Sequence, residues 1–190
     1  MRLAQGSALG QRKTYQTKPP CKGKSNQPGV TPCSNININM AQSLCKIYLH
    51  IIFHIKTGSP EIENEHLPRL HQYIGSLVNS TGCQVLCVGG IGNHVHVLLM
   101  FSKTESVAHV VEEMKRNSSR WVKTLSPKYD RFAWQSGYAA FSVSQSVVEK
   151  TRQYVMNQTE HHKKVSFRDE YISFLKLYNI EYDEKYVFSD

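Results

Sequence analysis

From residue 44 onward, the hydrophobic positions follow two periods, one of two residues and one of three to four residues. The shorter period, with β-branched and aromatic side chains, predicts strands, and the longer one predicts amphipathic helices. Along the chain we expect a strand at 45–55, a helix at about 62–80, a strand at 83–88, a turn at 89–93, a strand from 94 to 101, a helix at about 105–125, an interrupted strand at 132–144 broken near Gly137, and helices at 145–161 and 167–178.

This order of elements predicts the fold class. The succession β-α-β-β-α-β followed by helices is typical of a split βαβ, ferredoxin-like α+β sandwich. We therefore expect an antiparallel sheet with helices on one face, together with a C-terminal helix that carries Tyr154. Such a sheet would leave its other face free for a substrate or a partner.

The first 39 residues differ in composition from the rest of the chain. They are rich in Gly, Pro, Ser, Asn, Gln and Lys and hold few large apolar residues, so they cannot bury enough surface to offset the entropy of ordering. We expect 1–39 to be a disordered N-terminal extension and 40–190 to be a single domain. Met40 is then a candidate for the natural start of the protein.

The net charge of +8 says less about partners than it first suggests. Six of the 23 basic residues and none of the 15 acidic ones lie in 1–39, which leaves 17 basic against 15 acidic residues in 40–190. An interaction with nucleic acid must therefore rest on local features. The N-terminus lacks the apolar core of a signal peptide, and no apolar run approaches the length of a membrane span, so we expect a cytoplasmic protein without membrane contact.

Two pairs of residues are candidates for chemistry. His94 and His96 are two apart in a predicted strand, so both imidazoles project from the same side. Tyr154 and Gln158 are four apart in a predicted helix and also share a face. Two imidazoles, an amide oxygen and a phenol can form a metal site beside a nucleophile. The spacing does not choose between Gln158 and the neighbouring histidines at 161–162 as third ligand, and two structural histidines on a strand remain the simpler alternative.

A tyrosine nucleophile has a chemical advantage in work on phosphodiesters. A phenol with a pKa near 10 is ionised to only about one part in a thousand at neutral pH, so it needs a nearby cation that offsets the charge of the transition state. The phosphotyrosine that results keeps the energy of the cleaved bond. An enzyme of this kind can rejoin strands, whereas a hydrolase cannot.

The segment His94-Val95-His96, with Tyr154-Val155-Met156-Asn157-Gln158 downstream, resembles the HUH single-tyrosine transposases of the IS200/IS605 group. The resemblance covers roughly residues 41–188, and the extension at 1–39 is its one departure. Further blocks that resemble the family are Ala41–Ser43, Asn117–Trp121, Trp134–Ser144, Asn157–His162, Phe167–Tyr171 and Ile180–Tyr186.

The resemblance implies a function and the roles of four residues. His94 and His96 would bind Mg²⁺ or Mn²⁺ with Gln158 as third ligand, and Tyr154 would attack single-stranded DNA to form a 5′-phosphotyrosine link. The DNA would carry hairpin ends, the protein would act as a homodimer, and no small-molecule cofactor is implied. The alternatives are a related HUH endonuclease of the repeat-associated or replication type, and a non-catalytic ferredoxin-like module that binds nucleic acid.

The helix at 105–125 and the tyrosine helix also carry basic side chains. Taken alone, these side chains are better explained as an ordinary solvated surface. With the resemblance, they become candidate phosphate contacts. The candidates are Lys115, Arg116, Arg120, Lys123 and Arg152.

Overall fold

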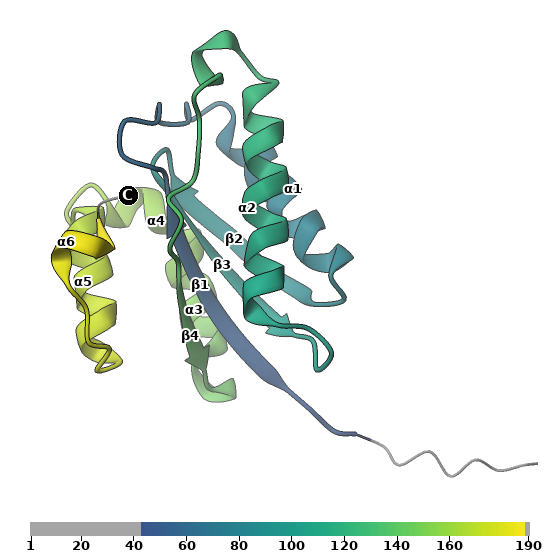
Figure 1. The fold of residues 1–190 in the computed structure, drawn as a ribbon. Coiled ribbons are helices and arrows are strands. Elements are labelled where there is room, and N and C mark those ends of the chain that lie inside the picture. Colours follow the sequence, from purple (N-terminus) through teal and green to yellow (C-terminus); the bar gives the residue numbers. More distant parts are fainter. Residues whose placement is uncertain (1–42, 189–190) are drawn as a thin grey trace, which may run out of the picture. The chain divides into compact units, whose positions relative to one another are not determined.

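A computed structural model describes residues 43–188, in which a four-stranded sheet lies between two groups of helices (Figure 1). In chain order the elements are β1 (Ile47–His54), α1 (Leu67–Ser80), β2 (Gln84–Ile91), β3 (His94–Phe101), α2 (Val107–Lys123), the 3-10 turn η1 (Pro127–Tyr129), β4 (Ala139–Val143), the 3-10 turn η2 (Gln145–Val147), α3 (Val148–Met156), α4 (Gln158–His161), α5 (Phe167–Leu177) and α6 (Glu184–Val187). The extension at 1–39 lies outside the described residues, so its disorder and the 40–190 domain stay predictions.

The sheet has the strand order β2-β3-β1-β4, and all neighbouring strands are antiparallel. The central strands β1 and β3 pair along their whole length, from Ile47 opposite Phe101 to His54 opposite His94. Two helices connect the strands in the split βαβ order, and the tyrosine helix follows them. The predicted α+β, ferredoxin-like class is confirmed.

One face of the sheet forms the main hydrophobic core. Alternate residues of β1 and β3 point to this face, where they pack against the apolar stripes of α1 and α2. The central core side chains of the two strands are completely buried, and they are Ile51, Phe53, Val95, Val97 and Leu99. Helix α1 begins at Leu67, later than the predicted start at 62, with Pro68 in its first turn, where the missing N–H of proline costs no hydrogen bond.

The sequence led us to expect that the opposite face of the sheet is free. Instead, C-terminal helices cover it (Figure 1). Val155 of α3 packs with Leu98 of β3, and Tyr171 of α5 packs with Ile52 and Phe141 of the sheet. Both helices have an apolar stripe that must be buried, and this face supplies the matching surface. Within the described residues, no helix combines the length and the apolarity that crossing a membrane requires.

The predicted turn at 89–93 is wrong over most of its length. Strand β2 continues through Ile91, with Gly89 opposite His96 and Gly90 opposite Val95, and the turn is confined to Gly92 and Asn93. A Cβ atom on Gly89 would lie 2.0 Å from the carbonyl oxygen of Val155. The glycine therefore lets the backbone of α3 approach the sheet closely, which is a common reason for glycine inside a strand.

The predicted helix at 145–161 is interrupted. It opens with η2, continues as α3, breaks at Asn157 (φ −100°, ψ 18°) and resumes as α4. The hydrogen bond from the Asn157 N–H to the Gln153 carbonyl oxygen, 3.0 Å, still links the two pieces. Tyr154 and Gln158 therefore lie on either side of the break but remain neighbours.

Candidate metal and nucleophile site

Four histidines from the two central strands, His50, His54, His94 and His96, lie on the face covered by α3 and α5. His94 and His96 of β3 are completely buried, and His50 of β1 is 2% exposed. The His50 Nε2 and His96 Nδ1 atoms are 2.9 Å apart, and the two rings stack with their centroids 5.1 Å apart. The antiparallel pairing of β1 and β3 thus places a third imidazole behind the two of the His-x-His motif.

The hydrogen-bond partner of His94 determines which of its ring nitrogens carries the proton and which can accept a hydrogen bond. Its Nδ1 lies 2.7 Å from the Oδ1 of Asn93, while the amide nitrogen of Asn93 donates to Glu61 at 3.5 Å. The amide oxygen can only accept, so Nδ1 of His94 carries the proton and Nε2 keeps a lone pair. That lone pair lies 3.3 Å from Oε1 of Gln158, which is also an acceptor. Two acceptors therefore face each other in a buried place.

Tyr154 and Gln158 reach the same place from the helical side. The hydroxyl of Tyr154 donates to Oε1 of Glu170 and lies 3.4 Å from Nε2 of His161. The amide nitrogen of Gln158 donates to the same carboxylate oxygen at 3.1 Å, and the Gln158 side chain is 1% exposed. The structure thus brings Tyr154 and Gln158 together with the two strand histidines.

Glu170 lies at the centre of the cluster and was missed as a site residue by the sequence analysis. It is 2% exposed and belongs to the first turn of α5, whose N-cap Ser166 accepts from the Asp169 N–H. Its Oε2 lies 3.4 Å from Nε2 of His96 and 3.8 Å from Nε2 of His94. The available signal was an acidic residue on the apolar stripe of an amphipathic helix, between Phe167 and Phe174.

Burial sets the protonation of the site. It lowers the pKa of His50 to about 3, and it also lowers the pKa values of His94 and His96, with the neighbouring imidazole adding to the effect at His50 and His94. Burial raises the pKa of the Tyr154 phenol, and the Glu170 carboxylate raises it further. Burial raises the pKa of Glu170 as well, but His96, Tyr154 and Gln158 outweigh it, so the net pKa is well below its usual range. Neutral imidazoles therefore surround an ionised carboxylate.

These groups fit a divalent metal ion. His94, His96, His162 and Glu170 each offer a ligand atom, and these atoms lie within 4.8 Å of one another. The His162 Nδ1 lies 2.8 Å from the carbonyl oxygen of Val165, which only accepts, so its Nε2 also keeps a lone pair. Nε2 of His96, Nε2 of His162 and Oε2 of Glu170 are buried and have no hydrogen-bond partner. Buried acceptors such as Nε2 of His162 and Oε2 of Glu170 are satisfied by a cation.

Tyr154 is half-buried and lies at the border of two surface pockets. One pocket also contains Lys150 and Phe174, and the other contains Lys163 and Lys164. The phenol can therefore be reached from solvent, and positive side chains lie beside the approach. This favours an anionic substrate.

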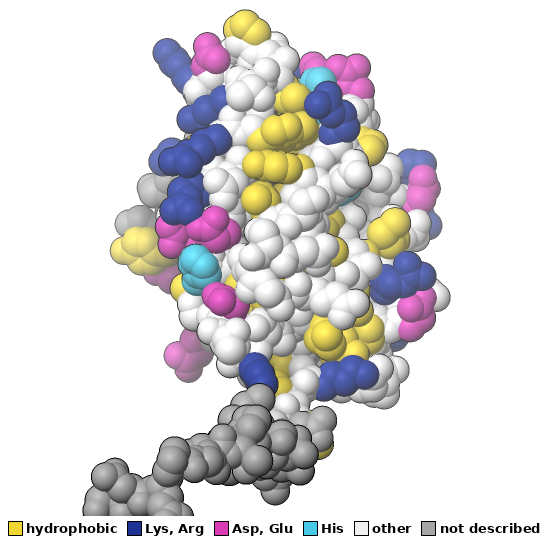
Figure 2. Space-filling model, turned by 90° about the vertical axis from the view of Figure 1, so that its right-hand side faces the viewer, with side chains coloured by type: hydrophobic (Ala, Val, Ile, Leu, Met, Phe, Trp, Pro, Cys, Tyr) yellow, Lys and Arg dark blue, Asp and Glu magenta, His cyan; other side chains and the backbone are white. Residues whose placement is uncertain are grey.

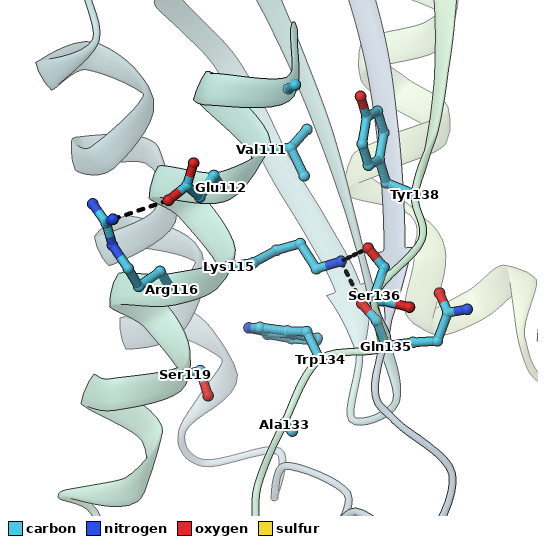
Figure 3. Close-up of a pocket in the computed structure, with 11 residues that line it drawn as sticks. Val111, Glu112, Lys115, Arg116, Ser119, Ala133, Trp134, Gln135, Ser136 and Tyr138 are labelled. Carbon is cyan, nitrogen blue, oxygen red and sulfur yellow. Dashed lines mark hydrogen bonds and ion pairs between the residues drawn. The ribbon is translucent and has the colours of Figure 1, made fainter. Parts of the chain in front are cut away.

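Four of the five basic candidates lie on α2, which packs on the other face of the sheet (Figure 1). The ammonium group of Lys115 donates to the backbone carbonyl oxygens of Gln135, Ser136 (3.0 Å) and Gly137 (2.9 Å), beside a pocket between α2 and the segment 133–138 (Figure 3). Lys115 thus stabilises this segment. The structure does not bring it to the tyrosine.

The remaining basic candidates lie on the surface. Arg116 pairs with Glu112 at 3.0 Å and with Glu113, and Arg152 of α3 pairs with Glu149 at 3.0 Å. Arg120 and Lys123 are exposed on α2. Figure 2 shows the face with α1 and α2, where Lys and Arg side chains lie at several separate places, often beside acidic ones. Of the five candidates, Arg152 alone shares a helix with Tyr154.

A split βαβ sheet that holds buried imidazoles beside a half-buried tyrosine is the arrangement expected of a single-tyrosine HUH enzyme. A family model described as "Transposase IS200 like" matches residues 43–158, more than half of the chain. The chain therefore belongs to the IS200-like, single-tyrosine transposase family.

Two solved structures are similar to the chain. A candidate transposase from Deinococcus radiodurans R1 is 20% identical, with a TM-score of 0.49, and the match covers 62% of this chain and 95% of that one. A REP-associated tyrosine transposase bound to a REP hairpin is 10% identical, with a TM-score of 0.43, over 60% of this chain and 66% of that one. A comparison with curated protein sequences gives no match.

Proposed function

We propose that this transposase cleaves and rejoins single-stranded DNA at the hairpin ends of an insertion element, with Tyr154 as the nucleophile. One observation carries the proposal: the Tyr154 hydroxyl and the buried imidazoles of His94 and His96 converge on a single carboxylate, Glu170. A phenol beside a site suited to a divalent cation has what strand transfer through a covalent intermediate requires.

The chemistry is a pair of balanced displacements. The Tyr154 oxygen forms a bond to the phosphorus, the bond from phosphorus to the 3′-oxygen breaks, and that oxygen takes a proton and leaves as a 3′-hydroxyl. The 5′-phosphotyrosine is then attacked by a DNA 3′-hydroxyl, which restores the phosphodiester and returns the proton to Tyr154. No bond energy is lost between the two steps, so no nucleotide cofactor is needed.

The residues around Tyr154 prepare the first step. The hydrogen bond to Glu170 orients the hydroxyl, and the raised pKa keeps the phenol protonated until DNA arrives. His94 and His96, with Gln158 as third ligand, would hold Mg²⁺ or Mn²⁺. The cation, when bound, would polarise the phosphate and offset the charge that develops during attack.

The test is formation of a covalent adduct on labelled single-stranded DNA that carries the element ends, in the presence of Mg²⁺ or Mn²⁺. We expect the wild-type adduct, and we expect Tyr154→Phe to abolish it, a loss of at least about 10³-fold, since a phenyl ring has no nucleophile. Tyr138→Phe is the matched control, because Tyr138 is 39% exposed and lines the pocket beside α2. An adduct that survives Tyr154→Phe contradicts the assignment.

A homodimer is also proposed, on the family resemblance, and its active sites can be tested by mixing. In the structure Tyr154 lies in the site of its own chain. If this holds during catalysis, a mixture of Tyr154→Phe and His96→Ala chains stays inactive. Recovery of activity in the mixture would show that each tyrosine serves the site of its partner.

A further inference from the structure

Glu170 lies beyond the residues that the family model matches, which end at Gln158, and it comes from a different helix. We propose that Glu170 is itself a ligand of the divalent metal, through Oε2, while its Oε1 holds the hydroxyl of Tyr154. This inference rests on the proposed function, in which His94 and His96 bind that metal.

The acceptor atoms around Glu170 lie at the distances expected of ligands to a common ion. Oε2 of Glu170 lies 3.2 to 3.8 Å from the Nε2 atoms of His162, His96 and His94, and Oε1 of Gln158 lies 3.3 Å from Nε2 of His94. Bond lengths near 2.1 Å place neighbouring ligands about 3.0 Å apart around an octahedral ion and about 3.4 Å apart around a tetrahedral one. These distances match the spacing of neighbouring ligands around one ion.

The nitrogen and oxygen atoms that face one another in this cluster include acceptors without a hydrogen-bond donor. Nε2 of His94 keeps its lone pair because Nδ1 donates to Asn93, and Nε2 of His162 keeps its lone pair because Nδ1 donates to Val165. Oε2 of Glu170 has no hydrogen-bond partner although the side chain is 2% exposed. A buried carboxylate oxygen that faces imidazole lone pairs is unfavourable by itself and favourable once a cation lies between them.

The two carboxylate oxygens have separate surroundings, which gives Glu170 two tasks. Oε1 accepts from Tyr154 and from Gln158, while Oε2 faces the imidazoles. Metal binding through Oε2 would therefore leave the hydrogen bond to Tyr154 intact and fix the nucleophile beside the ion. Helix α5, packed over Ile52 and Phe141 through Tyr171 and its neighbours, sets the position of the carboxylate.

The donor set also predicts which ion binds more tightly. Imidazole nitrogens favour transition metals, whereas Mg²⁺ prefers an all-oxygen shell that keeps several waters. With imidazoles and a carboxylate as ligands, we expect Mn²⁺ to bind at least about 10-fold more tightly than Mg²⁺.

The experiment measures Mn²⁺ affinity of the full chain without DNA, by calorimetry and by the electron paramagnetic resonance signal of free Mn²⁺. We expect Glu170→Gln to weaken binding about 100-fold or more, because an amide replaces the charged ligand. Glu160→Gln is the matched control: Glu160 is an exposed residue of α4, and it pairs with Lys163. Glu170→Asp, which keeps the carboxylate, should bind at least about 10-fold more tightly than Glu170→Gln.

Thermal unfolding separates a ligand from a residue with a purely structural role. If Glu170 is a ligand, Mn²⁺ raises the melting temperature of the wild-type chain and no longer raises that of Glu170→Gln. A lower melting temperature with the Mn²⁺ effect preserved overturns the inference.

The controls also separate this inference from the proposed function. If His96→Ala loses Mn²⁺ binding and Glu170→Gln keeps wild-type affinity, the inference fails while the proposed metal site stands. If the wild-type chain binds no divalent ion, the metal part of the proposed function fails, and the inference fails with it.

Discussion

The two faces of the central sheet are equally buried but chemically opposite. On β1 and β3, alternate residues such as Phe53 and Val97 pack against α1 and α2, where burial and dispersion stabilise the apolar side chains. The residues between them, such as His50 and His96, point to the other face, where buried polar atoms remain without partners. One strand therefore supports the fold with one half of its residues and holds a reactive cluster with the other half.

This contrast shows that the histidine face of the sheet lowers the stability of the fold in order to hold reactive groups. Buried imidazoles with lowered pKa values and a buried carboxylate cost free energy that the apolar face must supply. Substitutions on the apolar face should therefore change the free energy of unfolding, and substitutions on the other face should change metal binding and catalysis. The comparison can be tested residue by residue along the same strand.

The largest expected effect is that of His96→Ala on activity. We expect adduct formation to fall by at least about 10³-fold, because the metal loses a ligand. The free energy of unfolding should fall by about 1–3 kcal/mol, because the change leaves a cavity and removes the contact with His50. Its sequence neighbour provides the control: Val97→Ala should lower stability and leave the rate per folded molecule unchanged. Urea unfolding and adduct assays check both variants, and a His96→Ala chain with a tenth of wild-type activity would contradict the contrast.

Two adjacent leucines sharpen the comparison. Leu98 and Leu99 of β3 are both completely buried, but Leu99 packs in the α1–α2 core and Leu98 packs under α3 with Val155. We expect either change to alanine to lower the free energy of unfolding by about 2–5 kcal/mol. At a temperature where both variants are fully folded, only Leu98→Ala should also slow adduct formation, because Leu98 packs under α3, which carries Tyr154. Equal activity of the two variants would show that the position of α3 does not depend on this contact.

The sequence predicts those parts of the site that depend on neighbouring residues, but not those that depend on contacts between distant segments. Strand alternation places His94 and His96 on one face, and the spacing of Tyr154 and Gln158 keeps them neighbours despite the break at Asn157, because both patterns depend on a few consecutive residues. The position of Glu170 depends on how α5 packs across the sheet, which no local pattern specifies. Its acidic neighbour Asp169 is exposed, so composition alone does not tell which carboxylate is buried.

The error at residues 89–93 has the same origin. Glycine is common both in turns and where a helix backbone approaches a strand, and only the tertiary structure tells these apart. The free face expected for the sheet failed for a related reason. The apolar stripe of α5 was visible in the sequence, but the surface that it covers was not.

Gly89→Ala tests the contact between the sheet and the tyrosine helix. The added methyl group would lie 2.0 Å from the Val155 carbonyl oxygen, so α3 must shift. We expect a loss of about 1–3 kcal/mol in the free energy of unfolding, as for other overpacked sites, and slower adduct formation. Gly75→Ala is the control, because its Cβ would meet side-chain atoms of Val85 no closer than 3.5 Å. Wild-type activity in Gly89→Ala would mean that the position of α3 does not limit the reaction.

The smallest expected effect concerns His71, a histidine of α1 outside the cluster. Burial lowers its pKa to about 4, and its Nε2 has no hydrogen-bond partner. The unfolded chain, in which a histidine has a pKa of about 6.5, then binds the proton more readily than the folded chain. The contribution of His71 to stability is therefore complete above about pH 6.5 and is lost as the pH falls toward 4.

His71 is partly exposed, so solvent screening limits this loss to about 1–2 kcal/mol between pH 7 and pH 4.5. We expect metal-free His71→Gln to show a shallower fall of unfolding free energy over this window than the wild-type protein. His109→Gln, which changes an exposed histidine of α2, should follow the wild-type curve. Because the site histidines are present in all three proteins, their own acid sensitivity cancels in the difference. Parallel curves for wild type and His71→Gln would mean that the acid sensitivity belongs entirely to the buried cluster, which would make the contrast between the two faces sharper.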